Sequence, residues 1–372
     1  MSVVAIPFKD EPAEVILTNV EVAARHARID EVWAVGDGAR IAERARRIGL
    51  ECGKKIEVFP EERLGTLRPG KGDAMNTALQ RAAVEDIGRL HFYDADITNF
   101  DSSWIDGAEG GADAGFDVVR HTFPRAATDA MVTWFITKPL LAAKYPGTLL
   151  PRIGQPLGGE ILLTRAALRA LSPSKPIRER SDWGIDTLLT HGTVDAGLSL
   201  YEHHVAAGKQ HALYGSLQEL RQMVLECFDA ARSLPDRRPA TIEHHRDDDA
   251  PVPEELKRQI GYSREQTLPL LVMPLESAES AAAATAGGGL PEMLARVAEE
   301  GDVQDVDANW WGEFLRQAVK AFSLGDEGWE SLLFRMWVAR VVHYTERQAS
   351  QSFEFAMGYL EGTIKGYEVL AT

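Results

Sequence analysis

The feature that most constrains the fold of this chain is the alternation of short β-rich runs with helical patterns over its first hundred residues. Runs typical of strands cover residues 3–8, 31–35, 56–59 and 90–93, and helical patterns cover 12–24 and 73–85. Such alternation is typical of a mostly parallel sheet that is covered by helices. We therefore predict an α/β fold for the N-terminal part of the chain.

The middle of the chain carries fewer regular elements. Residues 158–163 resemble a strand that enters a helix at Thr164, and a further strand surrounds residues 198–201. Residues 235–254 are rich in Pro, Arg and Asp, and we expect a boundary loop there. The Ala, Gly and Ser run at 277–289 predicts a flexible connection.

The last part of the chain reads as helical. Trp, Phe, Met and Leu recur at helical spacing over 310–370, which predicts helices packed against the N-terminal domain or against another subunit of a homo-oligomer. The chain has 372 residues and is too long for one ordinary core. We predict an α/β domain over 1–235, a linker with a connecting helix over 236–290 and a C-terminal helical domain over 291–372.

Charge and cysteine content narrow the possible partners and the compartment. The formal net charge of −16 would repel nucleic acid and anionic membranes, although a local basic pocket for a small anion stays possible. Cys52 and Cys227 cannot build a disulfide framework. The first strand lacks a basic leader, and no apolar run reaches about 18 residues. We expect a cytoplasmic protein that binds neither nucleic acid nor membrane.

The strongest local signal is the pair Asp94 and Asp96 at the end of the apolar run 90–93. Alternation along a strand sends the two side chains to the same side, so both carboxylates can approach one divalent cation. The carboxyl ends of strands are also where open α/β folds bind ligands. A surface turn is the other interpretation of this pattern.

A glycine-rich basic loop over residues 63–76 opens the second predicted helix. Backbone N–H groups at the helix start, together with Arg68 and Lys71, form a site for anionic oxygens. Gly65 to Lys71 fits the pattern G-x-x-x-x-G-K. However, Gly72 replaces the Ser or Thr of a P-loop and no strand leads into Gly65, so we reject a P-loop NTPase. An ordinary glycine turn with solvated bases is the alternative.

Other site classes lack their signatures. A dinucleotide-binding dehydrogenase needs G-x-G-x-x-G after its first strand, and a serine hydrolase needs G-x-S-x-G; the chain has neither at the required place. The histidine pairs at 203–204 and 244–245 are interpreted as solvated, because neither has ligand partners at convincing metal spacing. His211, taken by itself, is more often a structural residue than a metal ligand.

Taken together, these segments resemble the mannosylglycerate synthases, retaining GT-A glycosyltransferases that join mannose from GDP-mannose to D-glycerate. The matching segments are 7–9, 62–76, 91–98, 119–121, 123–126, 128–131, 155–160, 180–187 and the loop of His211. They span residues 1 to 230, and the C-terminal half matches more loosely, mainly over 329–344. The resemblance implies an α/β fold of the GT-A class, a Rossmann-like mixed sheet with a C-terminal helical domain, and formation of the compatible solute 2-O-α-mannosylglycerate.

The resemblance also implies a set of site residues. Asp94, Asp96 and His211 would hold a divalent metal, Mg or Mn. The donor would be bound by Lys9, Glu11, Glu61, Arg68 and Lys71. The pocket for the sugar and the acceptor would include Arg125, Thr133, Leu157, Trp183, Asp186, Tyr214 and Met223. Two positions depart from the family pattern: Glu61 stands where a glutamine is expected, and Ala212 replaces a basic residue.

The expected mechanism is retention by front-face attack assisted by the departing phosphate. Lys71 would neutralise charge on the leaving group, and Leu157 would offer a backbone carbonyl near the reacting centre. A double displacement would need a carboxylate nucleophile, for which Asp186 is the candidate. Alternatives are a related transferase using GDP-glucose, 3-phosphoglycerate or glycolate, a sugar nucleotidyltransferase, and an inactive nucleotide-sugar binding protein.

Overall fold

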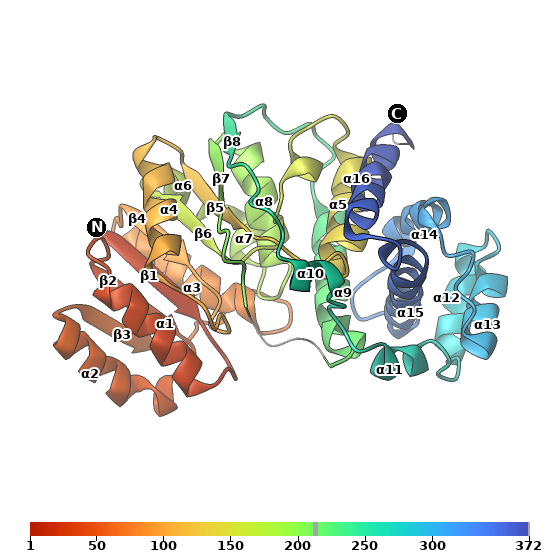
Figure 1. The fold of residues 1–372 in the computed structure, drawn as a ribbon, viewed down its shortest axis with the longest axis horizontal. Coiled ribbons are helices and arrows are strands. Elements are labelled where there is room, and N and C mark those ends of the chain that lie inside the picture. The colour runs from red at the N-terminus through yellow and green to blue at the C-terminus, as the bar shows by residue number, and fades with distance from the viewer. Residues whose placement is uncertain (211–214, 371–372) are drawn as a thin grey trace. The chain divides into compact units, whose positions relative to one another are not determined.

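A computed structural model describes residues 1–210 and 215–370 of the chain, which divides into two compact units (Figure 1). The first unit contains Met1–Pro124, Ile153–Ala212 and Arg237–Pro251. The second contains Arg125–Arg152, Leu213–Asp236 and Val252–Thr372. Each unit therefore combines segments that are distant in sequence. The contiguous domains at 1–235, 236–290 and 291–372 stay a prediction.

The first unit is built on a mixed sheet whose strands follow the order β3-β2-β1-β4-β6-β5-β7-β8. The strands are β1 (Ser2–Pro7), β2 (Glu31–Val35), β3 (Lys55–Phe59), β4 (Arg89–Phe92), β5 (Val118–Thr122), β6 (Ile161–Thr164), β7 (Leu200–His204) and β8 (His244–Arg246). β6 is antiparallel to both of its neighbours, and the other pairs are parallel. The α/β class and the strand runs predicted from the sequence are confirmed.

Helices cover both faces of this sheet (Figure 1). They are α1 (Ala13–Arg25), α2 (Ala42–Cys52), α3 (Lys71–Val84), α4 (Ser102–Asp113), α6 (Arg165–Leu171), α7 (Lys175–Arg178) and α8 (Ile185–Asp195). α1 and α4 bury apolar side chains against one face, around Val4 and Ile6 of β1. The chain moves along the sheet in one direction from β1 to β3, and the connection from β3 to β4 through α3 returns in the opposite direction. The helix α3 therefore packs on the other face of the sheet, together with α6 and α8.

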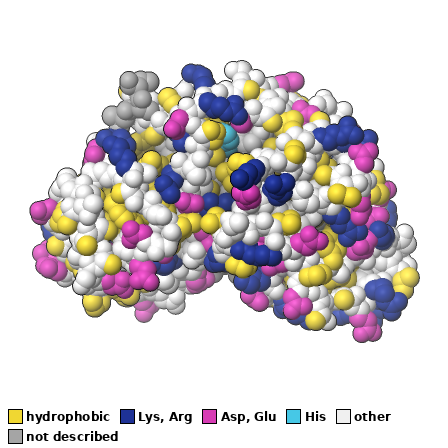
Figure 2. Space-filling view, turned by 180° about the vertical axis from the view of Figure 1, so that it is seen from behind, with side chains coloured by type: hydrophobic (Ala, Val, Ile, Leu, Met, Phe, Trp, Pro, Cys, Tyr) yellow, Lys and Arg dark blue, Asp and Glu magenta, His cyan; other side chains and the backbone are white. Residues whose placement is uncertain are grey.

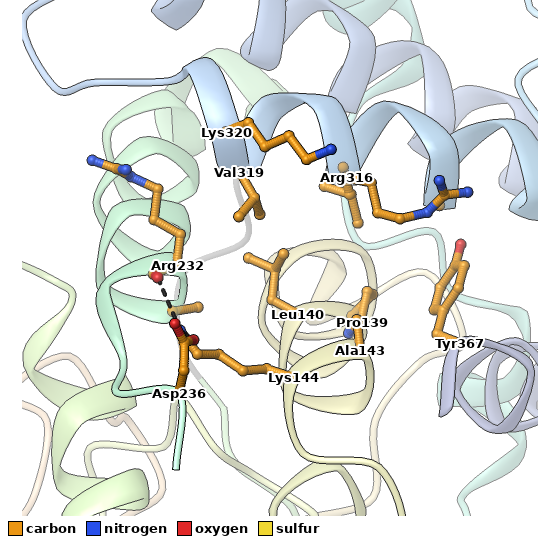
Figure 3. A pocket seen from close by; sticks show the side chains of 13 residues that line it. Pro139, Leu140, Ala143, Lys144, Arg232, Asp236, Arg316, Val319, Lys320 and Tyr367 are labelled. Atoms are coloured by element: carbon orange, nitrogen blue, oxygen red, sulfur yellow. Dashed lines mark hydrogen bonds and ion pairs between the residues drawn. The ribbon is translucent and has the colours of Figure 1, made fainter. Parts of the chain in front are cut away.

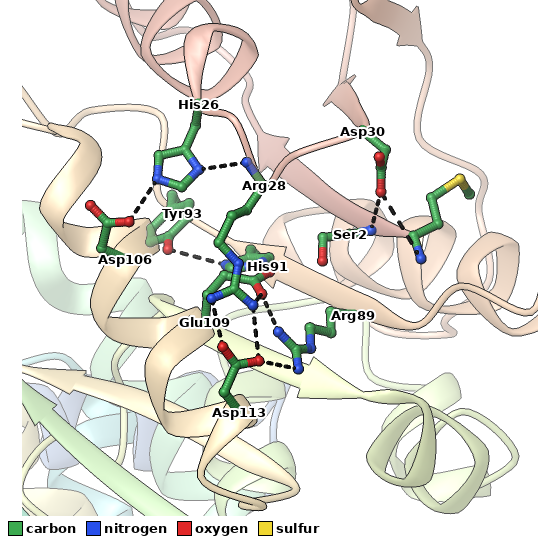
Figure 4. Close-up of polar contacts among 11 residues, drawn as sticks. Ser2, His26, Arg28, Asp30, Arg89, His91, Tyr93, Asp106, Glu109 and Asp113 are labelled. Atoms are coloured by element: carbon green, nitrogen blue, oxygen red, sulfur yellow. Dashed lines mark hydrogen bonds and ion pairs between the residues drawn. The ribbon is translucent and has the colours of Figure 1, made fainter.

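A buried ion network closes the amino end of β4 (Figure 4). The carboxylate of Glu109 on α4, only 1% exposed, is bonded by the Arg28 guanidinium at 2.7 Å, by His91 Nε2 at 2.9 Å and by Arg89. Burial raises the pKa of Glu109, but the bonds from His91 and Arg89 outweigh it and lower the pKa to about 2. This network fixes β4 at the end opposite to Asp94.

The predicted boundary loop at 235–254 is partly wrong, because it contains β8. The strand His244–Arg246 pairs in parallel with β7 and extends the sheet by one strand. The expectation that both histidine pairs are solvated is wrong for His203 and His204, which are partly buried, whereas His244 and His245 are exposed as expected. His203 Nδ1 lies 2.8 Å from Asp247, and His244 Nε2 lies 2.8 Å from Glu202. A three-residue strand is too short to produce a readable period in the sequence.

The second unit is helical, as the aromatic spacing of its C-terminal part predicts. Its helices are α5 (Lys138–Lys144), α9 (Arg221–Ser233), α10 (Glu254–Arg258), α11 (Arg264–Thr267), α12 (Ser277–Ala286), α13 (Leu290–Glu300), α14 (Ala308–Ala321), α15 (Glu327–Tyr344) and α16 (Phe353–Leu370). The buried α15 contacts the segment before α5, where Tyr344 Oη donates to Ala127 O at 2.9 Å. Trp311 of α14 donates to Phe135 O at 2.7 Å.

The run 277–289 was predicted to be a flexible connection, but its residues Ser277–Ala286 form the helix α12 and only its last three glycines lie outside a helix. Its Glu279 is fully buried and binds the Arg335 guanidinium of α15 at 2.7 and 3.0 Å. Arg335 also donates to the carbonyl oxygens of Leu271 at 2.7 Å and Met273 at 2.9 Å. Alanine favours helix, and the small side chains allow α12 to pack closely on α15. The small residues that suggested a linker are therefore the residues that close packing of α12 on α15 requires.

A pocket of about 410 Å³ lies within the second unit (Figure 3). Its lining includes the apolar side chains of Leu140, Leu315 and Val319 and the cationic side chains of Arg316 and Lys320. On the face that Figure 2 shows, acidic and basic side chains are interspersed. None of the helices over the described residues combines the length and the apolar character needed to cross a bilayer.

The Arg335–Glu279 pair gives a test of how α12 is held. We expect Arg335→Met to lower the free energy of unfolding by about 3 to 5 kcal/mol, because it leaves a buried carboxylate unpaired. The matched control is Arg316→Met, which removes an exposed pair with Glu313 and should cost less than about 1 kcal/mol. Urea denaturation measures both. Equal costs for the two variants would contradict this account of α12.

Candidate active site

The carboxyl ends of β1 to β4 bring four sequence-distant turns to one edge of the sheet. The turn after β1 carries Lys9 and Glu11, and the turn after β3 carries Glu61. The strand order reverses between β1 and β4, and open α/β sheets bind ligands at such a reversal. Asp94 and Asp96 directly follow β4. The structure thus places the predicted donor residues and the predicted metal carboxylates on one edge.

A pocket of about 900 Å³ lies over the ends of the first three strands. Lys9, Arg40, Phe59 and Glu61 are among its lining residues. Lys9 is exposed, and its backbone is held in place because Lys9 N donates to Glu11 Oε2 at 2.6 Å and Arg40 donates to Lys9 O at 2.7 Å. Burial and the nearby Asp73 raise the pKa of Glu61. The volume is within the range of small-ligand sites.

The glycine-rich loop is clamped onto the segment that precedes α8. Asn76 Nδ2 donates to Ile177 O at 2.8 Å and to Arg180 O at 3.0 Å. A Cβ at Gly72 would overlap the Arg180 carbonyl oxygen, so this close approach requires glycine. The clamp places Lys71, the first residue of α3, against Asp186 in the first turn of α8. Arg68 stays exposed in the loop.

Lys71 belongs to a charge cluster formed by Asp94, Glu160, Asp186, Lys71 and Lys209. Lys71 Nζ lies 2.9 Å from Asp94 Oδ1 and 3.1 Å from Asp186 Oδ2. Lys209 Nζ lies 2.7 Å from Asp94 Oδ2 and 2.6 Å from Glu160 Oε1. Each ammonium therefore bridges two carboxylates, and Asp94 joins the two bridges.

Burial and charge act against each other in this cluster. Burial disfavours the ammonium of Lys71, but Asp186, Asp94 and Glu160 raise its pKa above the ordinary lysine value. Burial would raise the pKa of Asp94, yet Lys209 and Lys71 hold that pKa well below its usual range. For Asp186 burial dominates and raises the pKa. The two lysines are thus fixed positive charges at the end of β4.

Asp96 is available to a metal in a way that Asp94 is not. Asp96 Oδ1 is buried and has no hydrogen-bond partner among the described residues, which fits an oxygen ligand for a hard cation. Both oxygens of Asp94 are bonded to lysines. No group of three His, Cys, Asp or Glu side chains within 1–210 and 215–370 is arranged to hold a metal. The predicted third ligand, His211, lies outside the described residues.

Two further predicted residues adjoin the cluster. The Trp183 ring lies 5.3 Å from Lys71 Nζ, at cation–π distance. Leu157 is half-buried in the turn that leads to Gly159. A Cβ at Gly159 would overlap both Asp94 Oδ1 and Lys71 Nζ. The turn containing Leu157 therefore approaches the cluster as closely as a backbone can.

The remaining predicted residues belong to the second unit. Arg125 Nη1 donates to Asp129 Oδ2 at 2.8 Å, which is the ion pair expected of a merely structural arginine. Thr133 is buried at the start of the π-helical turn Thr133–Thr137, and Met223 is half-buried on α9. Tyr214 lies outside the described residues. Their roles in binding stay predictions.

Sequence reasoning missed three charged residues of the site: Glu160, Lys209 and Arg120. Arg120 is buried within β5 and donates to Gly158 O at 2.7 Å and to Gln155 O at 3.2 Å, so it fixes the turn of Leu157. A charged residue inside an apolar strand was a readable signal. The signal for Glu160 and Lys209 was weaker: each lies in a segment rich in glycine and polar residues, where a charged residue is not unusual.

The chain matches two family models. The first, described as mannosylglycerate synthase, GT domain, covers residues 2–233, and the second, the C-terminal domain of that family, covers 256–364. A mannosylglycerate synthase from Selaginella moellendorffii is 42% identical over 98% of this chain and 89% of its own length. One from Rhodothermus marinus is 41% identical over 100% of this chain and 95% of its own length.

Solved structures resemble the chain more distantly. Glucosyl-3-phosphoglycerate synthase from Mycobacterium tuberculosis, in complex with Mn²⁺, UDP and phosphoglyceric acid, is 20% identical with a TM-score of 0.47, over 63% of this chain and 79% of that chain. Mannosyl-3-phosphoglycerate synthase from Rubrobacter xylanophilus is 19% identical with a TM-score of 0.43, over 62% and 72%.

Proposed function

Because this chain belongs to the mannosylglycerate synthase family and is a glycosyltransferase, we propose that it transfers mannose from GDP-mannose to D-glycerate. The product would be 2-O-α-mannosylglycerate, formed with retention and with the help of Mg or Mn. The observation that carries the proposal is the charge cluster, in which Lys71 stands at the start of α3 between Asp94 and Asp186. A departing diphosphate needs such fixed positive charge.

The donor half of the proposal rests on the pocket over β1 to β3. Lys9 and Arg68 are exposed cations on this edge of the unit and can bind phosphate oxygens. Glu61 lines the pocket as a hydrogen-bond acceptor when ionised. Guanine presents two adjacent N–H donors, which one carboxylate can accept together. Glu61 can therefore take the place of the expected glutamine without loss of guanine recognition.

The part of the proposal that concerns the leaving group rests on Lys71 and Asp96. A divalent cation bound by Asp96, with Asp94 and His211 as its other predicted ligands, would supply charge neutralisation to the diphosphate. Lys71 holds its own positive charge in place because Asp94, Asp186 and the Trp183 ring surround its ammonium. The chain thus offers an ammonium that does not have to reorganise when charge develops on the leaving oxygen.

Retention is assigned to front-face attack. The acceptor hydroxyl oxygen forms a bond to the anomeric carbon while the bond from that carbon to the diphosphate oxygen breaks. The hydroxyl proton passes to the departing phosphate oxygen. We prefer front-face attack to a double displacement because Lys71 is bonded to Asp186 Oδ2 and withdraws negative charge from this carboxylate. The carbonyl group of Leu157 is the proposed backbone contact to the reacting sugar.

Metal dependence is the first test of this proposal. Excess chelator should abolish transfer, and Mg²⁺ or Mn²⁺ should restore it. We expect Asp96→Asn to lower kcat by at least about a hundredfold, since it removes a charged ligand. Circular dichroism should show an unchanged fold. Glu14→Gln, an exposed carboxylate of α1, is the control for loss of one charge. Full turnover in excess chelator would contradict the proposal.

The acceptor is tested through Arg125. A guanidinium can bind a carboxylate through two parallel hydrogen bonds, and lysine cannot. We expect Arg125→Ala and Arg125→Lys to cost about 2 to 4 kcal/mol, a factor of roughly 30 to 1,000 in kcat/KM for D-glycerate. The KM for GDP-mannose should change little. Steady-state kinetics with both substrates measure this separation.

Asp129 supplies the control for Arg125. If Arg125 only forms its ion pair with Asp129, then Asp129→Asn should reproduce the full loss seen in Arg125→Ala. If Arg125 binds the acceptor, Asp129→Asn should keep most of the activity with D-glycerate. Glycerol, which lacks the carboxylate, should be a poor acceptor for the wild type. Equal use of glycerol and glycerate would exclude the proposed carboxylate contact.

A further inference from the structure

We propose that Lys209 is a positioning residue that serves as an internal counter-cation: it occupies the Asp94 carboxylate while no divalent cation is bound, and so makes the cation bind mainly together with the diphosphate. The inference rests on the proposed metal dependence. It assigns a role to Lys209, which lies in a segment that resembles the family but to which the resemblance gave no function.

The contacts of Lys209 are those of a built site. Its ammonium bridges Asp94 Oδ2 at 2.7 Å and Glu160 Oε1 at 2.6 Å, and its side chain is only 9% exposed. Glu160 is 1% exposed. Asp94 is a predicted metal ligand, and its other oxygen is bonded to Lys71. A divalent cation that takes Asp94 as a ligand must therefore compete with two ammonium groups for the charge of this carboxylate.

The backbone around Lys209 is fixed independently of these ion pairs. Asn99 Nδ2 donates to Gly208 O at 2.9 Å, and Asn99 Oδ1 accepts from Gln210 N at 2.8 Å. Thr98 N donates to Gln210 O at 2.8 Å. Lys209 is thus tied on both sides to the segment that immediately follows Asp96. Its position does not depend on the ion pairs that it makes, so it can give up Asp94 and stay in place.

The charge balance of the site explains why the Lys209 ammonium is needed here. Four carboxylates, those of Asp94, Asp96, Glu160 and Asp186, converge at the end of β4, and three of their acidic oxygens are buried without a hydrogen-bond partner among the described residues. Lys71 alone would leave a strongly negative site that attracts any free divalent cation. Lys209 reduces this attraction, and it adds positive charge where the diphosphate binds.

Opposite effects on two ligands follow from this charge balance. Without Lys209, the site gains a net negative charge and a free Asp94 oxygen, so the cation by itself should bind more tightly. The diphosphate loses a nearby ammonium and should bind more weakly. A lysine that only stabilises the fold would not separate the two affinities in this way. A charge within about 4 to 6 Å changes the proton affinity of a carboxylate by roughly one to three log units.

The experiment measures Mn²⁺ binding to the metal-free full-length chain by electron paramagnetic resonance, and GDP binding at fixed Mn²⁺ by calorimetry. For Lys209→Met we expect Mn²⁺ alone to bind at least about tenfold more tightly and GDP to bind at least about tenfold more weakly. Lys209→Arg should restore both affinities toward wild type. Lys320→Met removes the same charge from an exposed lysine of α14 and should change neither.

Glu160→Gln is the second variant, and it keeps the proposal testable if Lys209→Met does not fold. This variant removes one of the two carboxylate partners of Lys209, so the Lys209 ammonium pairs with Asp94 alone. Mn²⁺ without GDP should therefore bind more weakly than in the wild type. Unchanged or tighter Mn²⁺ binding in Glu160→Gln, or unchanged or weaker Mn²⁺ binding in folded Lys209→Met, would overturn the role of Lys209. A wild type that binds no Mn²⁺ even with GDP would instead overturn the metal dependence itself.

Discussion

The site depends on one interaction: the Asp94 carboxylate is held between two ammonium groups, Lys71 on one oxygen and Lys209 on the other. These lysines come from the start of α3 and from the loop after β7, and Asp94 itself ends β4. The cluster therefore forms only when the sheet order, the glycine-rich loop and the β7 loop are all in place. Its buried charges are acceptable because each lysine bridges two carboxylates, whereas a single unpaired member would be strongly destabilising.

The amino end of β4 carries a structural ion network, and its carboxyl end carries the candidate active site. At the amino end, Glu109 is saturated by arginines and a histidine, which makes an inert network. At the carboxyl end, buried oxygens of Asp96, Glu160 and Asp186 have no hydrogen-bond partner among residues 1–210 and 215–370. Unsatisfied buried oxygens cost free energy unless a ligand completes them. This contrast is the physical reason for placing the chemistry of a family glycosyltransferase at the carboxyl edge.

Sequence reasoning succeeded where a local pattern determines the structure. Apolar runs gave the strands, which the structure confirms. The metal role of Asp94 and Asp96, which follow such a run, stays a prediction. Sequence reasoning failed where the structure of a segment depends on a partner that is distant in sequence. Lys209 and Asp94 are 115 residues apart. The strand β8 forms only because β7 offers it a free edge for pairing. The Ala-rich α12 looked like a linker because its binding partner Arg335 lies on another helix. Resemblance supplied Arg125, Trp183 and Asp186, which no local period would have revealed.

The most direct test of the central claim is to identify the product. Purified full-length protein would be incubated with Mn²⁺ and each pairing of GDP-mannose or GDP-glucose with D-glycerate, 3-phosphoglycerate or glycolate, and the products analysed by mass spectrometry and proton NMR. The account predicts one dominant product, α-mannosylglycerate from GDP-mannose and D-glycerate, with the anomeric configuration of the donor retained. A β-linked product, or preferred transfer of glucose or to 3-phosphoglycerate, would contradict it.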